Sequence, residues 1–160
     1  MPQLKMLWEI QDLDVQKRAL EKELREGQIS NELRALKKEI EEGRAAYKKL
    51  KEKHNFLKKD LKDRELEVAA EREQLDNLGQ KLYSGAITNV KEINTTTKKI
   101  ENIKDMVNNM EDKMLDIMER MDAQHNKLEE MKAQLNGKAD DYRRLHRSYL
   151  DNQQEVKQQL

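Results

Sequence analysis

The sequence predicts an all-α protein, a long antiparallel coiled-coil helical hairpin that is kinked near Gly27-Ser30. Two observations lead to this fold class. Apolar residues recur at alternating steps of three and four along both halves of the chain, as they do in the seam of a coiled coil. Between the halves, the stretch KLYSGAITNVKEI from Lys81 to Ile93 contains residues typical of helix ends. We expect one unit, residues 1–160, with helix 1 about 3–82, a tip at 83–88 and helix 2 about 89–158.

The composition excludes several functional classes. A content of 40% charged and 4% aromatic residues suits exposed helices better than a compact core. The 32 basic residues balance the 32 acidic ones, so no net field draws nucleic acid to the chain. Without cysteine there is no disulfide, thiolate nucleophile or cysteine-bound zinc. No apolar run approaches the roughly 18 residues of a membrane span, and the start does not resemble a signal peptide, so we expect a cytoplasmic protein without membrane contact.

The first segment, from Leu4 to Arg25, has its own apolar repeat. The repeat consists of Met6, Ile10, Leu13, Leu20 and Leu24, with Lys17 as its polar member. The next repeat begins at Ile29, five residues after Leu24, so the phase changes across Gly27-Ser30. This change predicts a break there, either a kink or a loop.

Beyond this break the two seams keep their phase over most of the chain. The seam of helix 1 comprises Ile29, Leu33, Leu36, Ile40, Gly43, Tyr47, Leu50, His54, Leu57, Leu61, Arg64, Val68, Glu71, Leu75, Leu78 and Leu82. The seam of helix 2 comprises Ile93, Thr96, Ile100, Ile103, Val107, Met110, Met114, Ile117, Met121, Gln124, Leu128, Met131, Leu135, Lys138, Tyr142, Leu145, Tyr149, Asn152, Val156 and Gln159. We expect loose or hydrated packing at Gly43, His54, Arg64 and Glu71.

The position of the turn predicts the register of the hairpin. If the turn centres on Gly85-Ala86, residue i lies opposite about residue 172 minus i. The basic stretch 44–64 then faces the more acidic stretch 108–128, which favours an antiparallel arrangement.

The tip is the predicted site of partner binding, because the seam itself is covered. The candidate residues are Tyr83, Ser84, Gly85, Asn89, Lys91 and Glu92. Turn and cap chemistry explains Ser84, Gly85 and Asn89 equally well: Gly85 suits a left-handed position after a helix, and Asn89 with Glu92 forms the pattern of a capping box. This alternative accounts less well for Tyr83 and Lys91.

Two other interaction modes remain open. The basic residues Lys48, Lys49, Lys58, Lys59 and Lys62 form a candidate nucleic-acid face, although interhelical charge pairing and solvation explain them better. A homodimer through an apolar edge with Trp8, Met106 or Met118 is the third possibility. His54, His125 and His146 are too far apart on a hairpin to share a metal ion. We expect no catalysis, because the chain has neither a phosphate-binding loop nor a nucleophile elbow, and no cofactor in this chain.

The tip resembles a bacterial family that joins a coiled-coil hairpin to a C-terminal four-cysteine zinc ribbon. The family pattern K-L-Y-S-G-x-V/I-x-N-P-K-E-L is matched by Lys81, Leu82, Tyr83, Ser84, Gly85, Ile87, Asn89, Lys91, Glu92 and Ile93. A second pattern, L-E-D-x-x-L-x-x-M-E, is matched by Glu111, Asp112, Leu115, Met118 and Glu119, and the start is similar to the family's L-x-x-L-Q-x-x-D. Val90 stands in place of the usual proline.

The resemblance implies a regulatory or assembly role, with some members linked to flagellar or secretion systems. It implies a zinc ribbon after residue 160 that would bind zinc and contact protein or nucleic acid. The ribbon is missing here, because the chain is either shortened or from a member that lacks the module. The hairpin is therefore expected to act as a binding and spacing module, with a protein partner.

Overall fold

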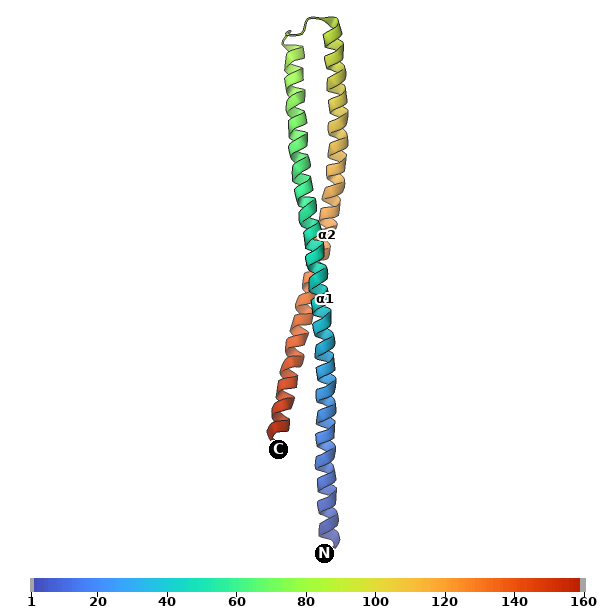
Figure 1. Ribbon diagram of the computed structural model, residues 1–160, viewed down its shortest axis with the longest axis vertical. Coiled ribbons are helices and arrows are strands. Elements are labelled where there is room, and N and C mark those ends of the chain that lie inside the picture. The colour runs from blue at the N-terminus through green and yellow to red at the C-terminus, as the bar shows by residue number, and fades with distance from the viewer. Residues whose placement is uncertain (1, 159–160) are drawn as a thin grey trace. The chain divides into compact units, whose positions relative to one another are not determined.

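The computed structural model describes residues 2–158, and the side chains of residues 2–155. It contains two long helices, α1 (Pro2–Tyr83) and α2 (Val90–Gln158), joined by residues 84–89 (Figure 1). No strand occurs among these described residues. The predicted all-α helical hairpin is confirmed, and each helix begins and ends within one residue of its expected position.

The hairpin is best described as two units. The tip unit is Lys48–Glu129, which includes the turn. The terminal unit contains α1 up to Tyr47 and α2 from Glu130 onward. In each unit a stretch of α1 packs along a stretch of α2, so each has its own part of the seam.

The tip unit contains the most deeply buried side chains. Val68 of α1 and Ile103 and Val107 of α2 form a buried cluster. Leu75, Leu78, Met110 and Met114 pack against this cluster. Aliphatic side chains at seam spacing thus form the core of this unit, as the repeat predicts.

The heptad repeat identifies the seam correctly on both helices. All 16 expected positions of α1 from Ile29 to Leu82 are buried or half-buried, and so are all 18 of α2 from Ile93 to Asn152. The side chains of the last two expected positions, Val156 and Gln159, lie outside the described residues. Burial of the seam removes apolar surface from water and is the main source of stability for such a pair of helices.

Contacts between the helices run in antiparallel order within each unit: residues 54 and 72 contact residues 124 and 111 in the tip unit, and residues 22, 39 and 43 contact residues 155, 138 and 135 in the terminal unit. In the tip unit the His54 and Gln124 side chains are hydrogen bonded. In the terminal unit Gly43 lies against the Leu135 side chain. Residue numbers 54 and 124, like 43 and 135, add to 178.

The expected register, based on 172, is therefore wrong by six residues. Two heptad seams interlock in steps of seven, and residue pairs that add to 171 bring seam residues together just as pairs that add to 178 do, so the repeat and the midpoint of the turn do not select the register. Residues 84–89 form an open connection rather than a tight turn, and this length accommodates the shift.

α1 continues through Gly27-Ser30 without interruption, so these residues do not form the loop that was one of the two expected kinds of break. The seam continues upstream through Lys22 and Glu26 instead of the expected leucines. Lys22 Nζ lies 3.9 Å from Glu155 Oε2, and Gln153 Nε2 donates a hydrogen bond of 3.3 Å to Glu26 Oε1. A glycine inside a helix costs only about 1 kcal/mol relative to alanine, which these contacts can offset.

Two of the four positions expected to be loose are closely packed. His54 is only 9% exposed, and its Nδ1–H donates a 3.1 Å hydrogen bond to Gln124 Oε1. A Cβ atom at Gly43 would lie 2.7 Å from Leu135 Cδ2, so the absence of a side chain lets the helices approach closely. Arg64 is half-buried, and its Nε bonds to Asp60 Oδ1 at 3.2 Å on the same helix. His54, Gly43 and Arg64 are thus each accommodated by a specific neighbour.

Candidate partner-binding site

The tip begins where α1 ends at Tyr83. The Ser84 backbone N–H donates a 2.9 Å hydrogen bond to the Gln80 carbonyl, which closes the last turn of the helix. Gly85 then has a φ of 75°, a left-handed conformation that disfavours any residue with a Cβ atom. The Ser84 hydroxyl also donates to the Lys81 carbonyl at 3.4 Å. Ser84 and Gly85 therefore have structural roles in terminating α1.

The tip ends at the cap of α2. Asn89 Oδ1 accepts a 3.0 Å hydrogen bond from the Lys91 backbone N–H, and the Asn89 carbonyl accepts one of 2.9 Å from the Ile93 N–H. These two bonds make Asn89 the N-cap, as the sequence predicts. No bond returns from the Glu92 side chain to Asn89 in the described part of the chain, so only half of the expected capping box forms. The Glu92 carboxylate lies in the first turn, where its charge favours the helix N-terminus.

Tyr83 is the tip residue that the turn does not explain. Tyr83 is 89% exposed, and its side chain takes no part in the hydrogen bonds that close the turn within the described residues. A tyrosine presents a large apolar ring and a hydroxyl at low entropic cost, which suits it to contacts between proteins. Exposed aromatic area at the end of a helix is therefore available for a partner.

A shallow hollow lies beside the start of α2. It is lined by Ile87, Asn89, Lys91, Glu92, Thr95 and Thr96. Ile87 is half-buried, whereas Lys91 and Glu92 are exposed. The Thr95 hydroxyl bonds back to the Lys91 carbonyl at 2.8 Å, which leaves its methyl group and the Ile87 side chain as apolar surface next to two opposite charges. No contact joins Tyr83 to Lys91 in the described structure, so they would act as two neighbouring contact points.

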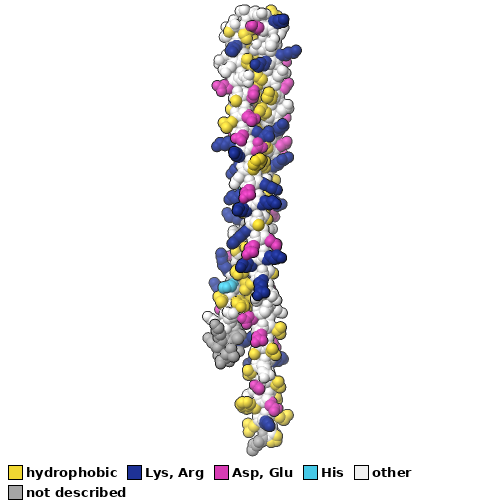
Figure 2. Space-filling view, in the orientation of Figure 1, with side chains coloured by type: hydrophobic (Ala, Val, Ile, Leu, Met, Phe, Trp, Pro, Cys, Tyr) yellow, Lys and Arg dark blue, Asp and Glu magenta, His cyan; other side chains and the backbone are white. Residues whose placement is uncertain are grey.

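The five lysines of the candidate nucleic-acid face are all exposed. Lys48, Lys59 and Lys62 lie on the side of α1 that is turned away from the seam, because they are out of phase with Leu50, His54, Leu57 and Leu61. None of Lys48, Lys49, Lys58, Lys59 and Lys62 forms an ion pair within residues 2–158. On the face that Figure 2 shows, basic and acidic side chains are mixed, and this face has no large basic surface.

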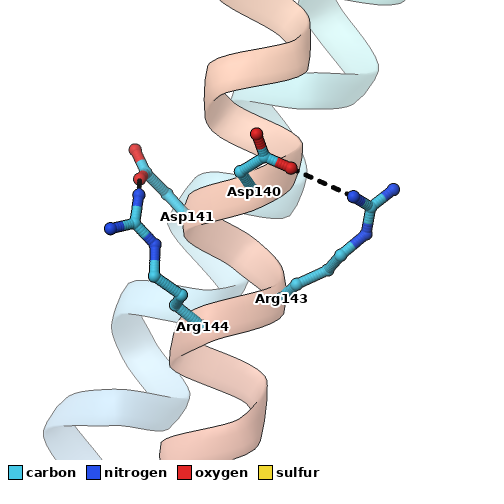
Figure 3. Close-up of polar contacts among 4 residues, drawn as sticks. All are labelled: Asp140, Asp141, Arg143 and Arg144. Atoms are coloured by element: carbon cyan, nitrogen blue, oxygen red, sulfur yellow. Dashed lines mark hydrogen bonds and ion pairs between the residues drawn. The ribbon is translucent and has the colours of Figure 1, made fainter.

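A second group of basic residues, near the end of α2, differs from these lysines because its members form ion pairs. Arg143 pairs with Asp140 at 3.0 Å and Arg144 pairs with Asp141 at 2.6 Å, each three residues apart on the same helix (Figure 3). These four side chains are more than half exposed, so each pair contributes little to stability. The pairs nevertheless reduce the positive field that the two arginines present.

The residues proposed for a homodimer are exposed but belong to different units. Trp8 lies in the terminal unit, and Met106 and Met118 lie in the tip unit. Trp8 is 75% exposed, and the two methionines are less so. The sequence reasoning missed the extent of exposed apolar surface near Trp8, because it assigned Met6, Ile10, Leu13, Leu20 and Leu24 to a seam.

The zinc that the family resemblance implies does not fit the residues present. The chain has no cysteine, and the described residues contain no group of three or more His, Asp or Glu side chains able to hold a metal ion. His54 has its own partner in Gln124. Within residues 2–158, neither helix contains a segment that is both long and apolar enough to cross a membrane.

The fold and the tip together define a two-helix hairpin protein with an exposed turn. Comparison of the chain with models of known families, with curated proteins and with solved structures found no match.

Proposed function

We propose that the chain is a non-enzymatic binding and spacing module that engages a partner protein at its tip. The observation that carries this proposal is the exposure of Tyr83, on a hairpin whose seam residues are buried or half-buried. The hollow lined by Ile87 and Lys91 supplies further apolar and charged surface close by along the chain. Rigid helices on either side hold this short segment in place, which lowers the entropic cost of binding.

The match of Lys81 to Ile93 with the zinc-ribbon family pattern supports a more specific proposal. By that resemblance the protein is a bacterial, cytoplasmic regulatory scaffold, and the hairpin positions whatever its tip binds. Ser84, Gly85 and Asn89 maintain the shape of the tip, whereas Tyr83 and Lys91 make the contacts.

The test is capture of partners from a bacterial lysate with the chain as bait. The tip variants Tyr83→Ala and Lys91→Glu should both lose the partner, because they remove the exposed ring and reverse the neighbouring charge. The matched controls are Phe56→Ala, which removes another exposed aromatic ring, and Lys48→Glu, which reverses another exposed charge. Both controls should keep the partner. Equal capture by all variants with unchanged helicity would move the contact away from the tip.

Nucleic-acid binding is a second candidate, supported by the five exposed lysines that lack ion pairs. Replacing Lys58, Lys59 and Lys62 by glutamate should then abolish binding of a single-stranded oligonucleotide and flatten its dependence on salt, because fewer counterions are released. Binding that survives this change, or no binding by the parent chain at low salt, would remove this candidate without affecting the tip proposal.

A further inference from the structure

The N-terminal part of α1 has an apolar stripe on one face. We define the outer stripe as Met6, Ile10, Leu13, Leu20 and Leu24, with Lys17 at the remaining heptad position. These apolar side chains are 53% to 67% exposed, whereas the seam residues of the hairpin are buried or half-buried. Five apolar residues at heptad spacing over 19 residues form the pattern of a helix that packs against another helix.

The α2 helix does not cover this stripe, even where the two helices lie together. Lys22 and Glu26 face α2, because they contact Glu155 and Gln153. Leu24 lies two residues from each of them, about 200° around the helix, and is therefore on the opposite side of α1. Its 67% exposure, in a stretch that has α2 alongside, confirms this placement. Whatever covers the outer stripe must approach from the side away from α2.

The charges beside the stripe restrict what this partner can be. The six positions that flank the core of the repeat are Leu7, Glu9, Asp14, Gln16, Glu21 and Glu23. Four of them are acidic and none is basic. In a second copy of the chain these positions would face one another, so Glu9 would meet Asp14 in a parallel pair, and Asp14 would meet Asp14 in an antiparallel pair. Such like-charge contacts disfavour pairing between two copies.

We propose that the outer stripe binds an amphipathic helix of another protein, with aliphatic core positions and lysine or arginine at the flanking positions. An acidic residue of this helix would face Lys17, the basic residue within the stripe. The site is separate from the tip, and the inference does not rest on the tip proposal.

The probe is a 21-residue helical peptide with leucine at its core positions, lysine at its flanking positions and glutamate placed to face Lys17. A second peptide differs only in having glutamate at the flanking positions. Calorimetric titration of the full chain should show binding of the lysine peptide that is about tenfold or more tighter than that of the glutamate peptide. Equal affinities, or no binding of the lysine peptide, would overturn the proposal.

Substitutions on the two sides of α1 locate the site. The double variant Ile10→Asp with Leu20→Asp should weaken binding of the lysine peptide by about tenfold or more, because it places two charges in the apolar contact. Trp8→Asp with Val15→Asp is the matched control: both residues are at least as exposed, but they lie on the continuation of the α2-facing seam. The control should keep the parent affinity. Equal loss in both double variants would contradict a site on the outer stripe.

Reversing the flanking charges tests the charge rule directly. The triple variant Glu9→Lys, Asp14→Lys and Glu23→Lys should prefer the glutamate peptide. An unchanged peptide preference in the triple variant would contradict the proposal. A reversible dimer of the parent chain that is lost in Ile10→Asp with Leu20→Asp would show that a second copy covers the stripe. Binding of phosphatidylcholine vesicles that depends on the same residues would show that a lipid surface covers it. Tyr83→Ala should leave the peptide affinity unchanged, so this test and the tip test fail independently.

Discussion

Individual residues of the turn and the seam have roles that their chemical type explains. Asn89 and Gly85 could be assigned from sequence, because N-caps and left-handed positions have strong residue preferences. The roles of His54 and Gly43 could not, because a histidine or glycine in a seam indicates a weak position until its opposite residue is known. The register places Gln124 beside His54 and Leu135 beside Gly43, and these partners make both positions close contacts.

The backbone at Gly85 leads to the first prediction. Gly85→Ala should lower the free energy of unfolding by about 1–2 kcal/mol, because an L-residue with a Cβ atom is strained at a φ of 75°. Gly27→Ala should raise it by about 0.5–1 kcal/mol, since Gly27 is helical and a Cβ atom there meets nothing within 4 Å. Urea denaturation followed by circular dichroism measures both. A change of the same sign in the two variants would contradict these assignments.

The buried polar pair leads to the second prediction. His54→Leu or Gln124→Leu alone should lower the free energy of unfolding by about 1–3 kcal/mol, because the first leaves the half-buried Gln124 side chain and the second the buried His54 side chain without its partner. The double variant should lose less than the sum of the two, since it leaves neither group unpaired. A double-mutant cycle with strictly additive losses would show that the two side chains do not interact.

At the scale of elements, the heptad repeat predicted which residues of each helix lie in the seam, from Ile29 to Leu82 and from Ile93 to Asn152. It did not predict which side of α1 near the N-terminus faces α2. One side carries Leu20 and Leu24 and the other carries Lys22 and Glu26. Hydrophobicity alone favours the side with the leucines. The seam keeps its phase with the long repeat downstream, so the polar pair faces α2 and the leucines are exposed.

This difference between stripes leads to the third prediction. Ile103→Ala should lower the free energy of unfolding by about 2–4 kcal/mol, because Ile103 is 5% exposed and packs in the cluster with Val68 and Val107. Leu24→Ala should change it by less than about 0.5 kcal/mol, because Leu24 is largely exposed. Chemical denaturation of the two variants measures this contrast. A large loss in Leu24→Ala would mean that the outer stripe is covered by the chain itself.

At the scale of the whole molecule, the sequence predicted a chain that turns back once, near residues 83–88, and the turn occurs at 84–89. The register could not be obtained from the turn alone, because it depends on how two seams interlock in steps of seven. The partner could not be identified either, because the exposure of Tyr83 and of the outer stripe shows which surface is available for binding and not what would bind there. The tip is a turn, and the outer stripe lies on the side of α1 away from α2, only if α1 and α2 pack together within one chain. Both surfaces therefore depend on this intramolecular pairing.

The most direct test of this pairing is a distance between spin labels at Lys58 and His125. The chain has no cysteine, so two introduced cysteines can be labelled cleanly. Both residues are exposed and belong to the tip unit. Their residue numbers add to 183, as do those of Arg72 and its ion-pair partner Glu111, so Lys58 and His125 lie opposite each other in the same register. We expect one short distance, consistent with helix axes about 8–10 Å apart, that is unchanged when labelled protein is diluted with unlabelled protein. A short distance that disappears on dilution would show that the labels meet between two chains. The absence of any short distance would show that the chain does not fold back on itself, because one continuous helix of 67 residues would hold the labels about 100 Å apart.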